Sequence, residues 1–112
     1  MIRIFVIGLI FFQSSAFAST VESTKIKSIL AGQAYGDIVF LQIDPKPENI
    51  DADCQKNAEF NFAFDPTTEI GKVTLSMVLT AYASQNDVYL DGWKICDTNH
   101  AGVEDVKQIW VK

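Results

Sequence analysis

The sequence predicts a mainly β, α+β domain in which five strands are joined by one helix placed between the third and fourth. Short runs of β-branched and aromatic residues recur between turn residues, which is typical of strands. One longer stretch, Glu69 to Ser84, has the spacing of a helix instead. Residues 19–112 contain no repeats or linkers and suffice for one modest core, so we expect a single domain there.

The first eighteen residues have the pattern of a secretory signal peptide. Arg3 gives a positive start, Ile4 to Phe12 form an apolar run, and Ala16-Phe17-Ala18 is a small-x-small cleavage site. A retained anchor helix is the alternative, but the uncharged run is shorter than the ~20 residues of a membrane span. We therefore expect cleavage after Ala18, a secreted or periplasmic location, and no membrane insertion.

The charge balance disfavours nucleic acid as a partner. The chain carries 9 Lys and Arg residues against 14 Asp and Glu, a formal net charge of −5. Its one arginine, Arg3, lies in the leader, so the domain has no guanidinium group for bidentate phosphate contacts. We expect no nucleic-acid binding.

Cys54 and Cys96 are the only cysteines, and in an oxidising compartment an even pair is most simply one disulfide. The loop-entropy model gives such a bridge about 4 kcal/mol of stabilisation. A redox pair or a metal site is the alternative, but there is no C-x-x-C pattern and His100 is the only histidine. We expect a structural disulfide, with no metal and no cofactor.

The strands of the N-terminal half are expected at Lys25–Leu30 and Ile38–Ile43, around a hairpin loop from Gly32 to Gly36. A proline-punctuated acidic loop follows the second strand. Phe60 to Phe64 then alternates three rings with small or polar residues, which predicts a third strand. The rings are expected in the core, although a surface platform for a ligand is the alternative.

The helix is expected from about Glu69 to Ser84, capped either by Asp65 or, after a turn, by Thr68. A fourth strand is expected from Val88 to Cys96 with a bulge at Gly92, and a fifth near 104–111.

The helix is expected to have two apolar faces. At 100° per residue one stripe would face the sheet, comprising Leu75, Val78, Leu79 and Tyr82. The opposite stripe carries no charge and would contact another subunit or a partner, through Val73, Met77 and Ala81. The alternative is that the bordering Thr and Ser residues simply solvate this outer face.

Five strands with a helix between the third and fourth is the order of an OB-fold, a small Greek-key barrel. In an exported chain with one disulfide, this order resembles the B subunits of pentameric bacterial toxins of the subtilase-cytotoxin type. The chain also resembles small exported proteobacterial proteins through Phe62-Ala63-Phe64-Asp65, Gly71-Lys72, residues 75–81, Gly92, Cys96 and Ile109-Trp110-Val111. The toxin resemblance implies glycan binding and a ring of subunits whose helices line a central pore. It places no glycan-binding residue on this sequence.

The candidate ligand residues are Tyr35, Trp93, Asp97 and Asn99. OB-folds usually meet ligands at the loops that join the first two and the last two strands. Tyr35, Asp97 and Asn99 are expected in these loops, and Trp93 is expected in the fourth strand beside the Gly92 bulge. A sugar site needs an aromatic face and amide or carboxylate groups, which the four supply. Each also has a structural reading, because Tyr35 would cover the hairpin, Trp93 would fill a barrel end and Asn99 suits a turn.

These features favour a non-enzymatic binding module that recognises a glycan or surface ligand and self-associates through its helix. The alternative is a monomeric periplasmic accessory or inhibitor protein whose helix docks a protein partner. A small exported hydrolase has little support, because the sequence offers no nucleophile–base pair and nothing in the spacing of the acids selects a catalytic pair.

Overall fold

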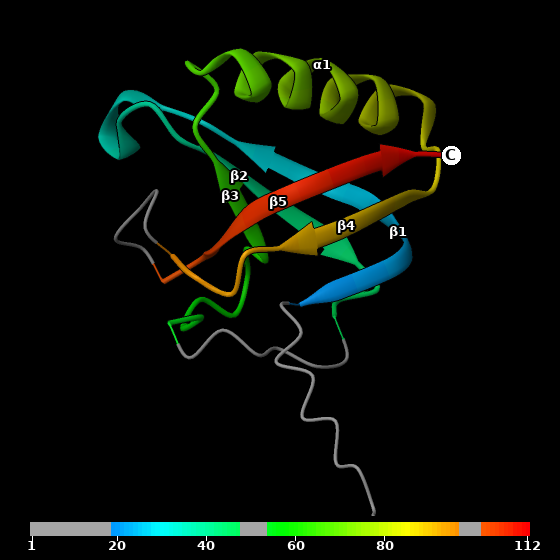
Figure 1. The fold of residues 1–112 in the computed structure, drawn as a ribbon, viewed down its shortest axis with the longest axis horizontal. Helices are drawn as coiled ribbons and strands as arrows, with labels where there is room; N and C mark the ends of the chain where they lie inside the picture. Colours follow the sequence, from blue (N-terminus) through cyan, green and yellow to red (C-terminus); the bar gives the residue numbers. More distant parts are fainter. Residues whose placement is uncertain (1–18, 48–53, 97–101) are drawn as a thin grey trace, which may run out of the picture.

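The computed structural model describes residues 19–47, 54–96 and 102–112 (Figure 1). The expected signal peptide, residues 1–18, lies outside the described residues. The elements are β1 (Thr20–Leu30), the short 3-10 helix η1 (Gln33–Tyr35), β2 (Val39–Asp44), β3 (Phe62–Phe64), α1 (Glu69–Ser84), β4 (Val88–Gly92) and β5 (Glu104–Val111).

The five strands form a closed barrel in the order β1-β2-β3-β5-β4, with β4 pairing back onto β1. Every pairing is antiparallel except that of β3 with β5. The long strand β1 closes the ring, because its first residues pair with β4 and its later residues pair with β2. This topology, with the helix between β3 and β4, confirms the predicted OB-fold-like barrel.

The barrel interior holds the main core. Side chains from all five strands and the helix meet there, including Ile26, Leu41, Phe62, Val78, Val88 and Leu90. A second, smaller cluster lies on the other face of β2 and β3, where Phe40 packs with Ala63 and Val103. Each face of β3 therefore contributes to one cluster. Phe62 and Phe64 point into the barrel core, and Ala63 points to the outer cluster.

The predicted third strand is too long at its start. Asn61 accepts the Ile43 N–H on its side-chain oxygen at 3.0 Å and donates its own N–H to the Leu41 carbonyl at 2.8 Å. These bonds replace the regular ladder, so the strand begins at Phe62. Phe60 consequently packs against the outer cluster, near Phe40, and only two of the three expected rings enter the barrel.

The other boundaries follow the sequence closely, with two exceptions. The helix limits and β5 are as predicted, and the register of β4 shifts at Gly92 as a bulge does. However, β4 ends at that glycine, well before Cys96. At the other end of the chain β1 begins at Thr20, five residues earlier than expected, because its polar outward residues conceal the alternation.

Cys54 and Cys96 form the predicted disulfide, with sequence separation 42 and Cα atoms 6.0 Å apart. A disulfide fits a protein located outside the cytoplasm. No helix in the described part of the chain is both long enough and apolar enough to span a bilayer.

Thr68 caps α1, because its hydroxyl accepts the Gly71 N–H at 2.9 Å. Asp65 instead holds the preceding turn by accepting the N–H and the hydroxyl of Thr67. Of the two predicted caps, the turn that hands over to Thr68 is therefore the one present.

The buried face of α1 differs from the predicted one. It consists of Gly71, Thr74, Val78 and Ala81, with Leu75 partly buried. A Cβ atom at position 71 would lie 1.8 Å from the Asp65 carbonyl oxygen, so the turn before the helix takes the space of a side chain there. The Thr74 hydroxyl is satisfied by the Ile70 carbonyl at 2.8 Å. Leu79 and Tyr82, predicted to face the core, are exposed.

The predicted outer stripe changes for the same reason. Val73 is exposed and Met77 is partly buried, but Ala81 is fully buried inside the domain. Ala81 is therefore unavailable as a partner contact. The large exposed apolar side chains of the helix are Ile70, Val73, Leu79 and Tyr82, which we call the helix surface. At 100° per residue, Ile70 and Val73 lie on one side of the helix, and Leu79 and Tyr82 lie on the opposite side.

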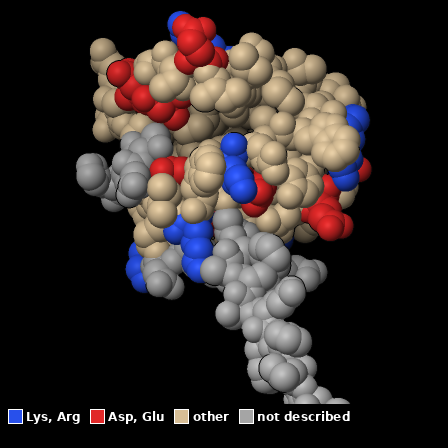
Figure 2. All heavy atoms as spheres, viewed as in Figure 1, with Lys and Arg blue, Asp and Glu red and all other residues tan. Residues whose placement is uncertain are grey.

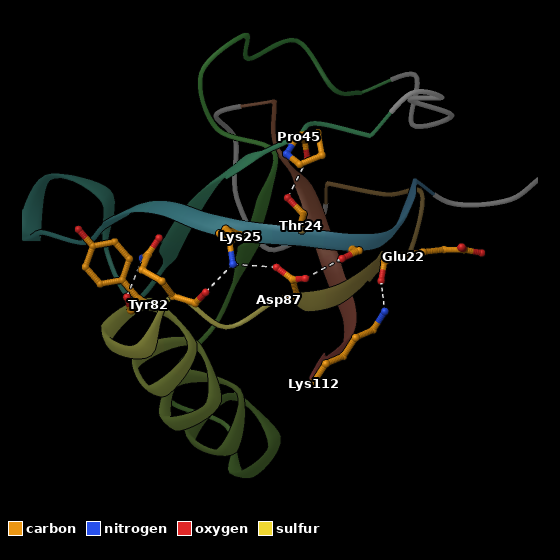
Figure 3. A network of polar contacts seen from close by, with 9 residues as sticks. Glu22, Thr24, Lys25, Pro45, Tyr82, Asp87 and Lys112 are labelled. Atoms are coloured by element: carbon orange, nitrogen blue, oxygen red, sulfur yellow. Dashed lines mark hydrogen bonds and ion pairs between the residues drawn. The ribbon is translucent and has the colours of Figure 1, made fainter.

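A polar network fixes the C-terminal end of α1 against β1 (Figure 3). The Lys25 ammonium donates to the Gln85 carbonyl at 2.6 Å and to the Asp87 carboxylate at 2.8 Å. The second carboxylate oxygen of Asp87 accepts from Ser23 at 3.2 Å. These hydrogen bonds, with Lys25 contributing most, lower the pKa of Asp87 from its ordinary value. The network orients the chain as it leaves the helix and enters β4.

Candidate binding surface on strands β4 and β5

Two of the four predicted ligand residues lie among the described residues. Tyr35 is 47% exposed at the tip of the hairpin, in η1, with its ring edge-on to Phe40 at 5.4 Å between centroids. Trp93 is 55% exposed just after β4. Asp97 and Asn99 lie outside the described residues.

Tyr35 and Trp93 have different neighbours. Tyr35 belongs with the rings of the outer cluster on β2, whereas Trp93 lies against Lys107 of β5, whose Nζ is 5.1 Å from the ring centroid. No contact described in the structure joins the two aromatic residues. Trp93 begins the connection between β4 and β5, and its contact with Lys107 sets it apart from Tyr35.

The surface that Trp93 and Lys107 share is the outward face of β4 and β5. Val88 and Leu90 point into the barrel. By strand alternation, Tyr89 between them and Asp91 after them point outward. Across the ladder, Tyr89 pairs with Trp110 and Asp91 pairs with Gln108. With Trp93 and Lys107, these residues form what we call the β4–β5 face, defined as Tyr89, Asp91, Trp93, Lys107, Gln108 and Trp110.

The Asp91 carboxylate lies at the centre of this face in a fixed orientation. One oxygen accepts the Thr20 hydroxyl at 2.8 Å, and the other accepts the Gln108 amide at 3.3 Å and lies 3.9 Å from Lys107 Nζ. The partners come from β1 and β5, the two strands that flank β4 in the barrel. The carboxylate is thus held by the sheet itself, and because Asp91 is only 8% exposed, a small part of it reaches the surface of this face.

Aromatic rings lie on both sides of the carboxylate. Trp110 is 64% exposed, and its ring is 6.5 Å from that of Tyr89 in a tilted arrangement. Beyond Asp91 along β4, Trp93 contacts Lys107, which is itself within reach of the carboxylate. Exposed rings that flank fixed polar groups suit a ligand with apolar C–H faces and hydroxyls, such as a sugar.

Sequence reasoning found only Trp93 of this face. Trp110 was hidden in an apolar run, Ile109-Trp110-Val111, whose middle residue faces outward. Asp91 follows the apolar Leu90, so strand alternation in the sequence predicts that Asp91 points outward. Gln108 lies beside Asp91 in the regular register of β4 and β5, and the register shifts only after this pair, at the predicted Gly92 bulge. Which residues of the two strands pair was not predicted from the sequence.

A second polar cluster lies inside the barrel end, around Glu104. This side chain is 1% exposed, and one of its oxygens accepts N–H groups from Ser19 at 3.3 Å and from Lys94 at 3.1 Å. Its own N–H donates to Gln55 at 2.7 Å. Burial raises the pKa of Glu104 above its ordinary value, against the lowering effect of the hydrogen bonds.

The hollow beside Glu104 does not fit a substrate. It is lined by Ser19, Pro47, Gln55, Asn61 and Glu104, and its cavity volume is about 0 Å³, too small for a water molecule. Among the described residues, no group of three or more His, Cys, Asp or Glu side chains is placed to hold a metal ion.

No protein-family model, curated protein or solved structure matches this chain. The structural observations that bear on function are therefore the fold, the β4–β5 face and the polar cluster around Glu104.

Proposed function

We propose that this chain is an exported, non-enzymatic binding module, secreted or periplasmic after loss of residues 1–18, whose β4–β5 face recognises a glycan. The observation that supports it is the pair of exposed rings, Trp93 and Trp110, on either side of the oriented Asp91 carboxylate. The rings would cover the C–H faces of a sugar and Asp91 would accept from its hydroxyls. The resemblance to toxin B subunits supports the same class of ligand.

Replacing Trp110 with alanine tests this proposal. The variant is expected to weaken binding of a glycan identified on an array by at least about tenfold, because truncating an aromatic residue at a binding hot spot costs about 2 kcal/mol or more. Isothermal titration calorimetry measures the affinity, and circular dichroism checks that the fold is retained.

Tyr35→Ala is the matched control, since it removes another exposed aromatic ring, from the hairpin instead. It is expected to leave the affinity unchanged. If Tyr35→Ala weakens binding while Trp110→Ala does not, the ligand site is at the hairpin loop and the β4–β5 face is the wrong assignment.

A second function, self-association or docking of a protein partner, is favoured by the helix surface. Ile70, Val73, Leu79 and Tyr82 are all exposed, and Figure 2 shows tan atoms over most of the helix, with the charged atoms there gathered toward its first turns. Solvent-facing helices of monomers usually carry charges along their length. We propose that a second copy of the chain covers the side of the helix that carries Leu79 and Tyr82, the alternative being a monomeric accessory or inhibitor protein that binds another protein there.

Light scattering tests the oligomer. Self-association predicts a multiple of the protomer mass, and Leu79→Glu is expected to return it to the protomer mass because the carboxylate would be buried unpaired at the contact. Gln33→Glu adds the same charge at the hairpin and is expected to leave the mass unchanged. A single-protomer mass for the unsubstituted protein would favour the accessory role, and an unchanged multiple in Leu79→Glu would place the contact elsewhere.

A further inference from the structure

Glu104 is a buried carboxylate without a cationic partner among the described residues. Its Oε2 atom receives two backbone N–H groups, from Ser19 and Lys94. Its Oε1 atom has no partner of good hydrogen-bond geometry in the part of the chain described, and the buried Ser19 hydroxyl, which also lacks such a partner, is the neutral side chain that lowers the pKa of this carboxylate. The charged side chain that acts on it is Asp91, also an acid, which adds to the unfavourable energy of the ionised form. A buried charge in this condition is normally costly.

The backbone is nevertheless shaped to hold this carboxylate. A Cβ atom at position 92 would lie 1.8 Å from Glu104 Oε2, so only glycine leaves room for the group there. Gly92 also donates its N–H to the Ser19 carbonyl at 3.0 Å, which places the start of β1 beside the acid. The carboxylate, the glycine and the Ser19 backbone therefore form one fitted arrangement.

Ser19 is the residue that follows the expected cleavage site, and its nitrogen lies 3.3 Å from Glu104 Oε2. We propose that removal of the signal peptide supplies the missing cation, so that the new α-ammonium group of Ser19 forms a buried ion pair with Glu104. Hydrolysis breaks the C–N bond between the Ala18 carbonyl carbon and the Ser19 nitrogen. The Ala18 carbonyl carbon takes the hydroxyl, and the Ser19 nitrogen takes the hydrogen and then a proton from solvent. The inference rests on cleavage after Ala18.

The exchange of an amide for an ammonium changes both charge and hydrogen bonding. The amide nitrogen of Ser19 has one N–H to donate, whereas an ammonium has three, which provides donors for the unpartnered Oε1. The positive charge would lower the pKa of Glu104, and the carboxylate would raise the pKa of the α-amino group. Removal of the signal peptide would thus join the start of β1 to the start of β5 through an ion pair.

The sign of the pH dependence differs between the two forms. In the unprocessed chain the folded-state pKa of Glu104 lies above its unfolded value, so stability falls as pH rises through the window between them. In the processed chain the paired Glu104 has a lowered pKa, so its contribution is present at neutral pH and is lost on acidification. Comparing the protein with its Glu104→Gln variant separates the contribution of this carboxylate to the pH dependence of stability from that of the other acids.

The experiment is a double-mutant cycle on the exported protein. One form begins at Ser19 and the other retains Ala18, and each is made with Glu104 and with Glu104→Gln. In the form beginning at Ser19, Glu104→Gln is expected to raise the unfolding equilibrium constant about 100-fold at pH 7, as for a broken buried pair. In the form retaining Ala18 the same substitution is expected to leave it unchanged or to lower it.

An equal effect of Glu104→Gln in both forms would overturn the proposal. So would mass spectrometry of the exported protein that places its first residue elsewhere than Ser19. If the form with Ala18 fails to fold, titration of the α-amino group in the processed protein still decides. A pKa above the ordinary ~7.7–8.0 that returns to this range in Glu104→Gln supports the pair, and an ordinary pKa in both proteins rejects it.

Discussion

Replacing Cys54 and Cys96 together with serine is expected to lower the free energy of unfolding by about 4 kcal/mol. The bridge joins residues 42 positions apart, and loop-closure entropy of the unfolded chain makes a bridge of this span strongly stabilising. It also ties the segment before β3 to the segment after β4, two connections that share no strand pairing. Urea denaturation followed by circular dichroism measures the change.

Reduction of the unsubstituted protein provides the control, because it opens the same bridge without altering a side chain. The reduced protein and the doubly substituted protein are expected to unfold at the same urea concentration. A loss below about 1 kcal/mol in both would show that the loop entropy is already restricted in the unfolded chain, contrary to the model.

Phe62→Ala is expected to cost about 3–5 kcal/mol, the usual range for removing a fully buried aromatic ring. Phe62 is 0% exposed and lies opposite Leu41 on β2 and Glu104 on β5, so its ring is surrounded by the barrel interior. The three-residue strand β3 has few other anchors, and a cavity there weakens both of its pairings. Denaturant unfolding measures the loss.

Phe60→Ala is the matched control, because it removes the same ring two residues away. Phe60 is only partly buried and packs against the outer cluster, so its loss is expected to be less than half that of Phe62. Equal losses at the two positions would contradict the inward and outward assignment of the rings.

The helix illustrates how far the sequence predicts this fold. Its limits were predicted because Thr68 and the turn before it are local signals that depend on a few neighbouring residues. Its buried face was mispredicted because apolar character was used to rank Leu79 and Tyr82 above Gly71 and Thr74. A Cβ atom at position 71 would meet the Asp65 carbonyl oxygen, and the Thr74 hydroxyl is satisfied by the helix backbone, so the placement of the helix rather than apolar character decides which residues are buried.

The binding surface was predictable only in part for a related reason. Trp93 stood out as an aromatic residue beside a bulge, but its contact with Lys107 follows from the register shift between β4 and β5. Glu104 gave no signal at all, since one acid at the start of a strand usually faces water. Its burial depends on the space left by Gly92, a contact between strands.

The two-sided pairing of β1 also bears on how the chain folds. The later residues of β1 pair with β2, which is near in the sequence. Its first residues can pair only after β4 has formed, about seventy residues further along the chain. In a chain that emerges amino end first, the hairpin forms early while the first part of β1 keeps unpaired backbone groups. Such an open edge invites association with other unfinished chains until the C-terminal strands arrive. Ring closure is therefore the step at which a holding chaperone would be of most use.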